Sequence, residues 1–190
     1  MLDRLQAYDT LLFLFLNNLG SEPYDGFWLV LTNKWASIPL YVVLLYLVYR
    51  KYALKGTLWV LLCAAVLVAA SDQLANLFKY ILVQRPRPCQ VDTLKEQMRL
   101  VAQVCGRFGY YSAHASGSMA IAVFIGLIFR SRYRYLPFIL LLWAVLIGYS
   151  RIYLGVHYPL DVISGMAFGG FLGWLAYQLQ QWGQRRLAKA

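Results

Sequence analysis

The chain has 190 residues, of which 61% are hydrophobic and 14% charged, and its mean hydropathy is +0.53. This composition, with long uncharged runs, is typical of an integral membrane protein and argues against a water-soluble globular one. The net charge of +10 does not indicate a nucleic-acid partner, because Lys and Arg form short clusters beside apolar runs. Such clusters are typical of the cytoplasmic ends of membrane spans. The length fits one membrane-embedded domain, residues 1–190, in contact with membrane lipids.

The first apolar stretch, residues 5–18 (LQAYDTLLFLFLNN), is short. A helix needs about 20 apolar residues to cross the ~30 Å hydrocarbon core of a bilayer. We therefore expect an amphipathic helix that lies in the membrane interface. A short or tilted sixth span is the alternative.

Five further apolar segments are expected to be transmembrane helices. They lie within residues 27–49, 57–83, 113–129, 136–149 and 160–181. The predicted fold class is all-α: a polytopic membrane helix bundle with five transmembrane helices and the N-terminal helix. The last segment carries glycines at 165, 169, 170 and 173, which suit close packing against a neighbouring helix.

Basic clusters predict how these segments cross the membrane. The clusters follow the first, third and fifth segments: Arg50, Lys51 and Lys55; Arg130, Arg132 and Arg134; Arg185, Arg186 and Lys189. With alternating directions all three clusters lie on one face, which the positive-inside rule makes cytoplasmic. The size and the short loops suggest a bacterial protein. We therefore expect the inner membrane, with residues 84–112 and 150–159 on the periplasmic face.

Several cations on that outer face break the positive-inside rule. They are Lys79, Arg85, Arg87, Lys95, Arg99, Arg107 and Arg151. Arg85 and Arg87 could be interface anchors that extend to lipid headgroups. Because these cations break the rule, we expect several of them to serve a purpose other than topology.

Three stretches, 79–88, 111–116 and 150–161, are expected to converge on the outer face. They supply the cations Lys79, Arg85, Arg87 and Arg151, the hydroxyl of Ser112, and both histidines, His114 and His157. Arginine and lysine hold phosphate oxygens, arginine in a bidentate manner. The start of the third span, at Ser112, also offers free backbone N–H groups.

These residues are suited to phosphoryl transfer. One histidine can attack phosphorus and the other can protonate the departing oxygen. His157 and Asp161 are four residues apart, so on a helix the carboxylate can reach the imidazole. Because the cations already neutralise the phosphate charge, we expect no metal and no cofactor.

Two polar residues inside the second span, Asp72 and Asn76, share a helix face with Lys79. Ionisable groups within a membrane are costly and usually functional. We expect the two residues to lie just behind the phosphate-binding groups, or Asp72 merely to balance a neighbouring cation.

Cys89 and Cys105 both fall in the segment 84–112, which is expected to cover the site. If that face is periplasmic, the compartment permits a disulfide, and we predict one between Cys89 and Cys105.

The motifs of these stretches resemble those of the type 2 phosphatidic acid phosphatase family, lipid phosphate phosphatases related to vanadium-dependent haloperoxidases. The family pattern Ser-Arg-x5-His-x3-Asp is matched in full from Ser150 to Asp161. Pro-Ser-Gly-His is matched by Ser112 and His114, with Tyr111 and Ala113 in place of proline and glycine. The resemblance covers residues 72–169.

The remaining family pattern, Lys-x6-Arg-Pro, is matched with altered spacing. Arg87-Pro88 follows Lys79 with one intervening residue more than the family pattern has. Arg85-Pro86 follows it with one intervening residue fewer. A helix irregularity would absorb the difference. We expect Arg87 to be the main phosphate clamp.

The resemblance implies a metal-free phosphohistidine mechanism, with His157 as nucleophile and His114 as general acid. It implies phosphate contacts from Lys79, Arg87 or Arg85, Ser112, Ser150 and Arg151. The expected reaction removes the terminal phosphate of an amphiphilic lipid: undecaprenyl diphosphate, phosphatidylglycerophosphate, phosphatidate or a lipid A phosphate. A phosphate-binding transporter or sensor without turnover is the alternative, and haloperoxidase chemistry is a second one.

Overall fold

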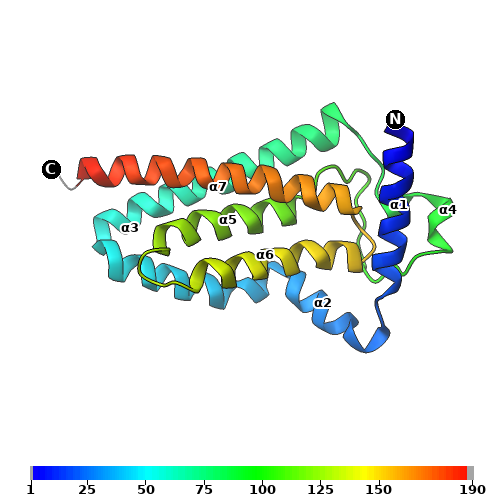
Figure 1. The fold of residues 1–190 in the computed structure, drawn as a ribbon, viewed down its shortest axis with the longest axis horizontal. Helices are drawn as coiled ribbons and strands as arrows, with labels where there is room; N and C mark the ends of the chain where they lie inside the picture. The colour runs from blue at the N-terminus through cyan, green and yellow to red at the C-terminus, as the bar shows by residue number, and fades with distance from the viewer. Residues whose placement is uncertain (1, 188–190) are drawn as a thin grey trace.

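The computed structural model describes residues 2–187, and within this range the chain is helical and contains no β-strand (Figure 1). The α-helices are α1 (Leu2–Asn18), α2 (Asp25–Thr32), α3 (Ile38–Leu77), α4 (Asp92–Lys95), α5 (Ala113–Phe129), α6 (Leu136–Tyr153) and α7 (Pro159–Leu187). Short 3-10 turns occur at Glu22–Tyr24, Lys34–Ser37 and Pro88–Gln90, and a π-helical turn at Phe78–Leu82. The all-α prediction is confirmed.

Helix α3 is two antiparallel arms rather than one rod. Its 40 residues would extend about 60 Å if straight, twice the thickness of a bilayer core. At Ala53 the backbone leaves the helical region, with φ 52° and ψ −168°. Figure 1 shows the chain doubling back at this point. We call residues 38–52 the first arm and 54–77 the second arm.

Three helical segments are long and apolar enough to cross a membrane: Lys34–Leu82, Leu136–Tyr153 and Pro159–Leu187. The first of these contains both arms of α3. Helix α5 is also apolar but has 17 residues. The chain is therefore a membrane protein.

The segment predicted within 27–49 is interrupted. Asn33 adopts an extended conformation, and its side chain accepts a hydrogen bond from the backbone N–H of Trp35 at 3.0 Å. Such local side-chain capping competes with helix continuation. Helix α2 therefore ends at Thr32 and meets the bundle obliquely, and the first arm begins only at Ile38.

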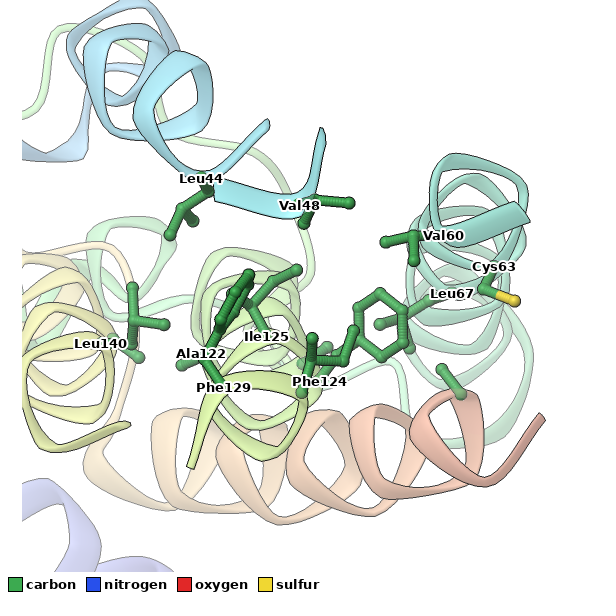
Figure 2. Close-up of a cluster of buried hydrophobic side chains, with 14 residues drawn as sticks. Leu44, Val48, Val60, Cys63, Leu67, Ala122, Phe124, Ile125, Phe129 and Leu140 are labelled. Atoms are coloured by element: carbon green, nitrogen blue, oxygen red, sulfur yellow. The ribbon is translucent and has the colours of Figure 1, made fainter. Parts of the chain in front are cut away.

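Helix α5 is the centre of the bundle. Figure 2 shows it surrounded by the two arms of α3, by α6 and by α7. The buried side chains between them include Leu44 and Val48 of the first arm, Val60 and Leu67 of the second arm, Phe124 and Phe129 of α5, and Leu140 of α6. The central part of α5 is thus packed against all the other long helices.

Helices α5 and α7 approach each other closely along a row of glycines. A Cβ atom at Gly165 would lie 2.6 Å from the backbone oxygen of Ser112, and one at Gly169 would overlap the backbone of Ser116. Only glycine permits this separation. The same contact brings the start of α7 against the start of α5, where the backbone N–H of Ser112 donates to the carbonyl of Asp161 at 2.9 Å.

The three basic clusters share one end of the bundle, as predicted. The bend of α3, the α5–α6 connection and the C-terminal part of α7 lie at one end (Figure 1), and these are the places of the three basic clusters, apart from Lys189, which lies outside the described residues. Helix α1 lies across the opposite end, nearly perpendicular to the long helices, next to the segment that contains α4. A crosswise position is the one expected of an interfacial helix.

The glycine row generates a test of the fold. Gly169→Ala should force α5 and α7 apart, since overpacking a tight contact costs about 1–3 kcal/mol. We expect the melting temperature in detergent to fall by about 3–10 °C. Gly170→Ala is the matched control, because a Cβ there would lie 3.7 Å from Met119 Cγ, an ordinary contact. Equal melting temperatures for the two variants would contradict the close packing of α5 against α7.

Candidate active site

The second arm of α3 ends in the π-helical turn Phe78–Leu82, which carries Lys79. The N–H of Val83 donates to the carbonyl of Phe78 at 2.9 Å, a bond across five residues. A π turn takes up one residue more than an α turn and is frequent at functional sites. It therefore absorbs the extra residue between Lys79 and Arg87-Pro88. The side chain of Lys79 is buried, with 7% of the residue exposed.

The segment 84–112 folds back on itself and directs Arg87 inward. The N–H of Arg87 donates to the carbonyl of Arg107 at 3.2 Å, and Cys89 and Cys105 form a disulfide with a Cα–Cα distance of 6.6 Å. Arg87 Nε donates to the carbonyl of Phe108 at 2.9 Å. This bond orients the guanidinium. Its other N–H groups have no hydrogen-bond partner among residues 2–187 and can bind a ligand.

The same segment lies directly against the predicted histidine–aspartate pair. A Cβ atom at Gly109 would lie 2.9 Å from Asp161 Oδ2 and 3.5 Å from His157 Nδ1. A side chain at this position would displace the pair, so glycine is needed for the close approach.

His157 and Asp161 are in contact, but not as neighbours on one helix. Helix α7 begins at Pro159, so His157 lies in the turn before it. Its Nδ1 is 3.3 Å from Asp161 Oδ2, which also accepts from the N–H of Tyr158 at 3.1 Å. His157 is 1% exposed and Asp161 is fully buried.

The turn before α7 depends on Gly155, whose φ is +78°. A Cβ atom there would lie 2.8 Å from the carbonyl oxygen of Arg99. The N–H groups of Val156 and His157 both donate to the carbonyl of Arg151, at 3.1 and 3.2 Å. The backbone of the histidine is thereby tied to the end of α6.

Burial lowers the pKa of His157 well below its ordinary value of 6.5, and the nearby charges of Arg87, Arg151 and Lys79 lower it further. The imidazole is therefore neutral at physiological pH. With Nδ1 facing the Asp161 carboxylate, the tautomer that donates from Nδ1 leaves a lone pair on Nε2. A neutral imidazole with a free lone pair is a nucleophile.

Arg151 and Ser150 lie at the end of α6 and differ in their contacts. Arg151 Nη1 donates to Thr32 Oγ1 at 2.7 Å, and its buried Nε has no hydrogen-bond partner among residues 2–187. Ser150 Oγ instead donates to the carbonyl of Ile147 at 2.6 Å, within its own helix. Arg151 thus has capacity for an anionic ligand, whereas the Ser150 hydroxyl proton is already engaged.

Ser112 and His114 form the start of α5. Ser112 is the N-cap, and its Oγ accepts from the N–H of Ala115 at 3.4 Å. The electrostatic neighbours of His114 are Arg151, His157, Lys79 and Arg87. His114 is exposed and lines a cavity of about 190 Å³. The structure therefore brings both predicted histidines together with three of the four predicted cations.

Arg85, the fourth predicted cation, has different partners. Its Nη1 donates to Asp9 Oδ2 at 2.6 Å and to Asp161 Oδ1 at 3.3 Å. The guanidinium lies 3.7 Å from the ring centre of Tyr158. Two carboxylates and an aromatic ring hold Arg85 beside the histidine–aspartate pair rather than free to bind phosphate.

Asp72 and Asn76 bond to each other, Asn76 Nδ2 donating to Asp72 Oδ2 at 3.3 Å. Asp72 is exposed, and its charge acts on Lys79 from outside the site.

Sequence reasoning did not find Asp9 or Thr32. The available signal for Asp9 was an acidic residue inside the apolar N-terminal stretch.

A buried histidine–aspartate pair, a second histidine and three cations, at one end of a helical membrane bundle, are suited to chemistry on phosphate groups. The sequence matches the family model of the PAP2 superfamily over residues 60–185. The chain belongs to this superfamily, as its motifs predicted, and it is a membrane phosphatase. Its membership favours an enzyme over the transporter or sensor alternative.

Several relatives have phosphatase names. The chain is 35% identical over 179 residues to a lipid A 4'-phosphatase of Bacteroides thetaiotaomicron, covering 93% of this chain and 79% of that protein. It is 29% identical over 178 residues to a lipid A 4'-phosphatase of Porphyromonas gingivalis, with coverages of 92% and 74%. Its fold is similar to the crystal structure of a transmembrane PAP2-type phosphatidylglycerolphosphate phosphatase from Bacillus subtilis, with a TM-score of 0.73, 20% identity, and coverages of 94% and 87%.

The disulfide of the segment 84–112 generates a second test. The chain has three cysteines, of which Cys63 is free and buried in α3. Thiol labelling of the denatured, unreduced protein should modify one cysteine, and labelling after reduction should modify all three. The Cys63→Ser variant is the control and should label only after reduction. Labelling of Cys89 and Cys105 before reduction would contradict the bridge.

Proposed function

We propose that the protein hydrolyses the terminal phosphate of an amphiphilic lipid phosphate, with a lipid A phosphate as the first candidate. The buried His157–Asp161 pair, with its neutral imidazole among cations, is the observation that carries this proposal. The lipid A candidate is supported by the two relatives of that name, which match more than nine-tenths of the chain. Undecaprenyl diphosphate, phosphatidylglycerophosphate and phosphatidate are the other candidates.

In the proposed first step, Nε2 of His157 attacks phosphorus. The P–N bond forms as the P–O bond to the lipid breaks, and His114 donates a proton to the departing oxygen. Asp161 accepts the Nδ1–H hydrogen bond and stabilises the positive charge that develops on the ring. In the second step, His114 takes a proton from water, and the resulting hydroxide attacks the phosphohistidine and releases inorganic phosphate. The histidine pair returns to its starting state.

We further propose that Arg87, Lys79 and Arg151 hold the non-bridging oxygens of the phosphate, together with the free N–H groups at the start of α5. Three cations neutralise the charge that increases in the transition state, so the step is proposed to need no metal. Ser112 serves as the N-cap that orients this helix start. Ser150, whose hydroxyl bonds within α6, would act by shaping the turn that carries Arg151.

The cavities beside His114 support an amphiphilic substrate. Thr32, Lys34 and Ser37 line the cavity next to His114, which offers polar groups for a headgroup. An apolar groove of about 350 Å³ lies between the two arms of α3 and α5, and Tyr41, Val68 and Ile121 line both spaces. Figure 2 shows Leu44 and Val48 of the first arm across from Val60 of the second. An acyl chain can occupy the groove while its headgroup reaches His114.

The membrane arrangement is part of the proposal. The two arms of α3 together with α5, α6 and α7 are proposed as five membrane crossings, and residues 1–190 as a single domain. The three basic clusters would face the cytoplasm of a bacterial cell. The active site, covered by residues 84–112, would then face the periplasm, where a disulfide is stable.

Phosphate release from a panel of the four lipid phosphates, in detergent and with a chelator present, tests the function. We expect the highest kcat/KM for a lipid A phosphate and no loss of rate with chelator. His157→Ala should lower kcat by about 10³-fold or more, since it removes the nucleophile, while lipid binding changes little. Quenching with phosphorus-labelled substrate under non-acidic conditions should trap label on His157. If no histidine carries the label and the His157→Ala variant is still active, the proposed mechanism is wrong.

The phosphate clamp is tested by vanadate, which resembles phosphate in its charge and oxygen geometry. Arg87→Ala should weaken inhibition by vanadate about tenfold or more, because a charged hydrogen bond contributes about 1.5–3 kcal/mol. Arg85→Ala should weaken it less than about threefold, since the Arg85 guanidinium already binds two carboxylates. If Arg85→Ala weakened inhibition more than Arg87→Ala, Arg85 would be the phosphate clamp.

A further inference from the structure

Asp9 is an acidic residue buried where the crosswise helix α1 meets the bundle. It is 4% exposed, and both of its oxygens have partners. Oδ2 accepts from Arg85 Nη1 at 2.6 Å, and Oδ1 accepts from the backbone N–H of Leu160 at 2.9 Å. A buried carboxylate is costly unless it is paired and hydrogen-bonded. Here both conditions are met, so the position of this carboxylate is closely specified.

A short chain of contacts leads from Asp9 to His157. The same Nη1 atom of Arg85 that binds Asp9 also lies 3.3 Å from Asp161 Oδ1. The other oxygen of Asp161 faces His157 Nδ1 at 3.3 Å. Three contacts, through Arg85 and Asp161, therefore connect Asp9 to the imidazole, although 148 positions separate Asp9 from His157 in the sequence.

The charge of Arg85 is shared between two carboxylates. If Arg85 were paired with Asp161 alone, it would draw Asp161 away from the imidazole and weaken the carboxylate as an acceptor for Nδ1–H. Asp9 binds the same guanidinium nitrogen at the shorter distance, which leaves Asp161 with net negative charge to act on His157. The ring of Tyr158, 3.7 Å from the guanidinium, keeps Arg85 in this place.

Asp9 also acts on the backbone that carries Asp161. The N–H of Leu160 belongs to the first turn of α7, where N–H groups lack partners within the helix. By accepting this bond, Asp9 caps α7 from another helix. It thus holds the residue adjacent to Asp161 as well as the arginine that binds Asp161.

We propose that Asp9 is a positioning residue of the phosphatase, which acts through Arg85 and the first turn of α7 on Asp161 and so on His157. This inference rests on the proposed roles of His157 and Asp161. The family model matches residues 60–185, so helix α1 lies outside the matched region. If Asp9 positions Asp161, helix α1 nevertheless belongs to the active site. Asp9 touches neither the phosphate nor the lipid.

The charge of Asp9 is tested by Asp9→Asn, which keeps the shape and an acceptor for Leu160 N–H. We expect kcat to fall 10- to 100-fold with KM changed less than threefold, and Asp9→Glu to restore part of kcat. Asp3→Asn, at an exposed acidic residue of the same helix, is the matched control and should leave both constants unchanged. A normal kcat for Asp9→Asn would overturn the proposal.

A double-mutant cycle with Asp161→Asn separates positioning from general stability. If Asp9 acts through Asp161, adding Asp9→Asn to Asp161→Asn should lower kcat less than threefold further. The proposal would be overturned if Asp9→Asn lowered kcat by the same factor in the wild-type and the Asp161→Asn backgrounds and lowered the melting temperature equally in both. If the Asp9→Asn variant does not fold, Asp9→Glu replaces it in the cycle, and the same limit on the further loss of kcat applies.

His157→Ala keeps this inference distinct from the function on which it rests. Full activity of His157→Ala would refute the proposed function whatever the cycle shows. A normal kcat for Asp9→Asn, in an enzyme that His157→Ala inactivates, would overturn only the positioning role.

Discussion

The close approach of α5 and α7 is the constraint on which the site depends. Glycines at 165 and 169 allow the two backbones to touch, and the N–H of Ser112 then reaches the carbonyl of Asp161. Helix α5, which carries His114, is thereby joined to α7, which carries Asp161, the carboxylate partner of His157. Larger side chains along this row would separate the two halves of the site while leaving each helix intact.

The charges at this end of the bundle fall into two groups with different environments. Arg85 lies between two carboxylates, Asp9 and Asp161, and its charge is balanced within the protein. Around His157 lie Lys79, Arg87 and Arg151, which depress the pKa of the histidine. An excess of positive charge in a buried site is costly without an anion. The second group is therefore suited to a phosphate, and the first to holding the histidine–aspartate pair in place.

The segment 84–112 and helix α1 complete the site from outside the bundle of long helices. The disulfide and the backbone bond of Arg87 fold the segment back, so that Gly109 lies against His157 and Asp161. Helix α1 crosses the same end and contributes Asp9. In the proposed enzyme, chemistry at the membrane surface would thus be enclosed by elements that do not themselves cross the bilayer.

The sequence by itself determined the helical membrane class, the common end of the basic clusters and the family, since hydropathy, charge and short motifs are local properties. It also indicated a helix irregularity near Lys79, because neither Arg-Pro pair has the family's spacing from this lysine. The tertiary structure alone decided that the apolar segment after residue 27 breaks at Asn33, that Arg85 binds two carboxylates while Arg87 remains available, and that Asp9 belongs beside Asp161. These features depend on contacts between residues far apart in the chain or on side-chain bonds that compete with the helix, and neither is visible in hydropathy or spacing.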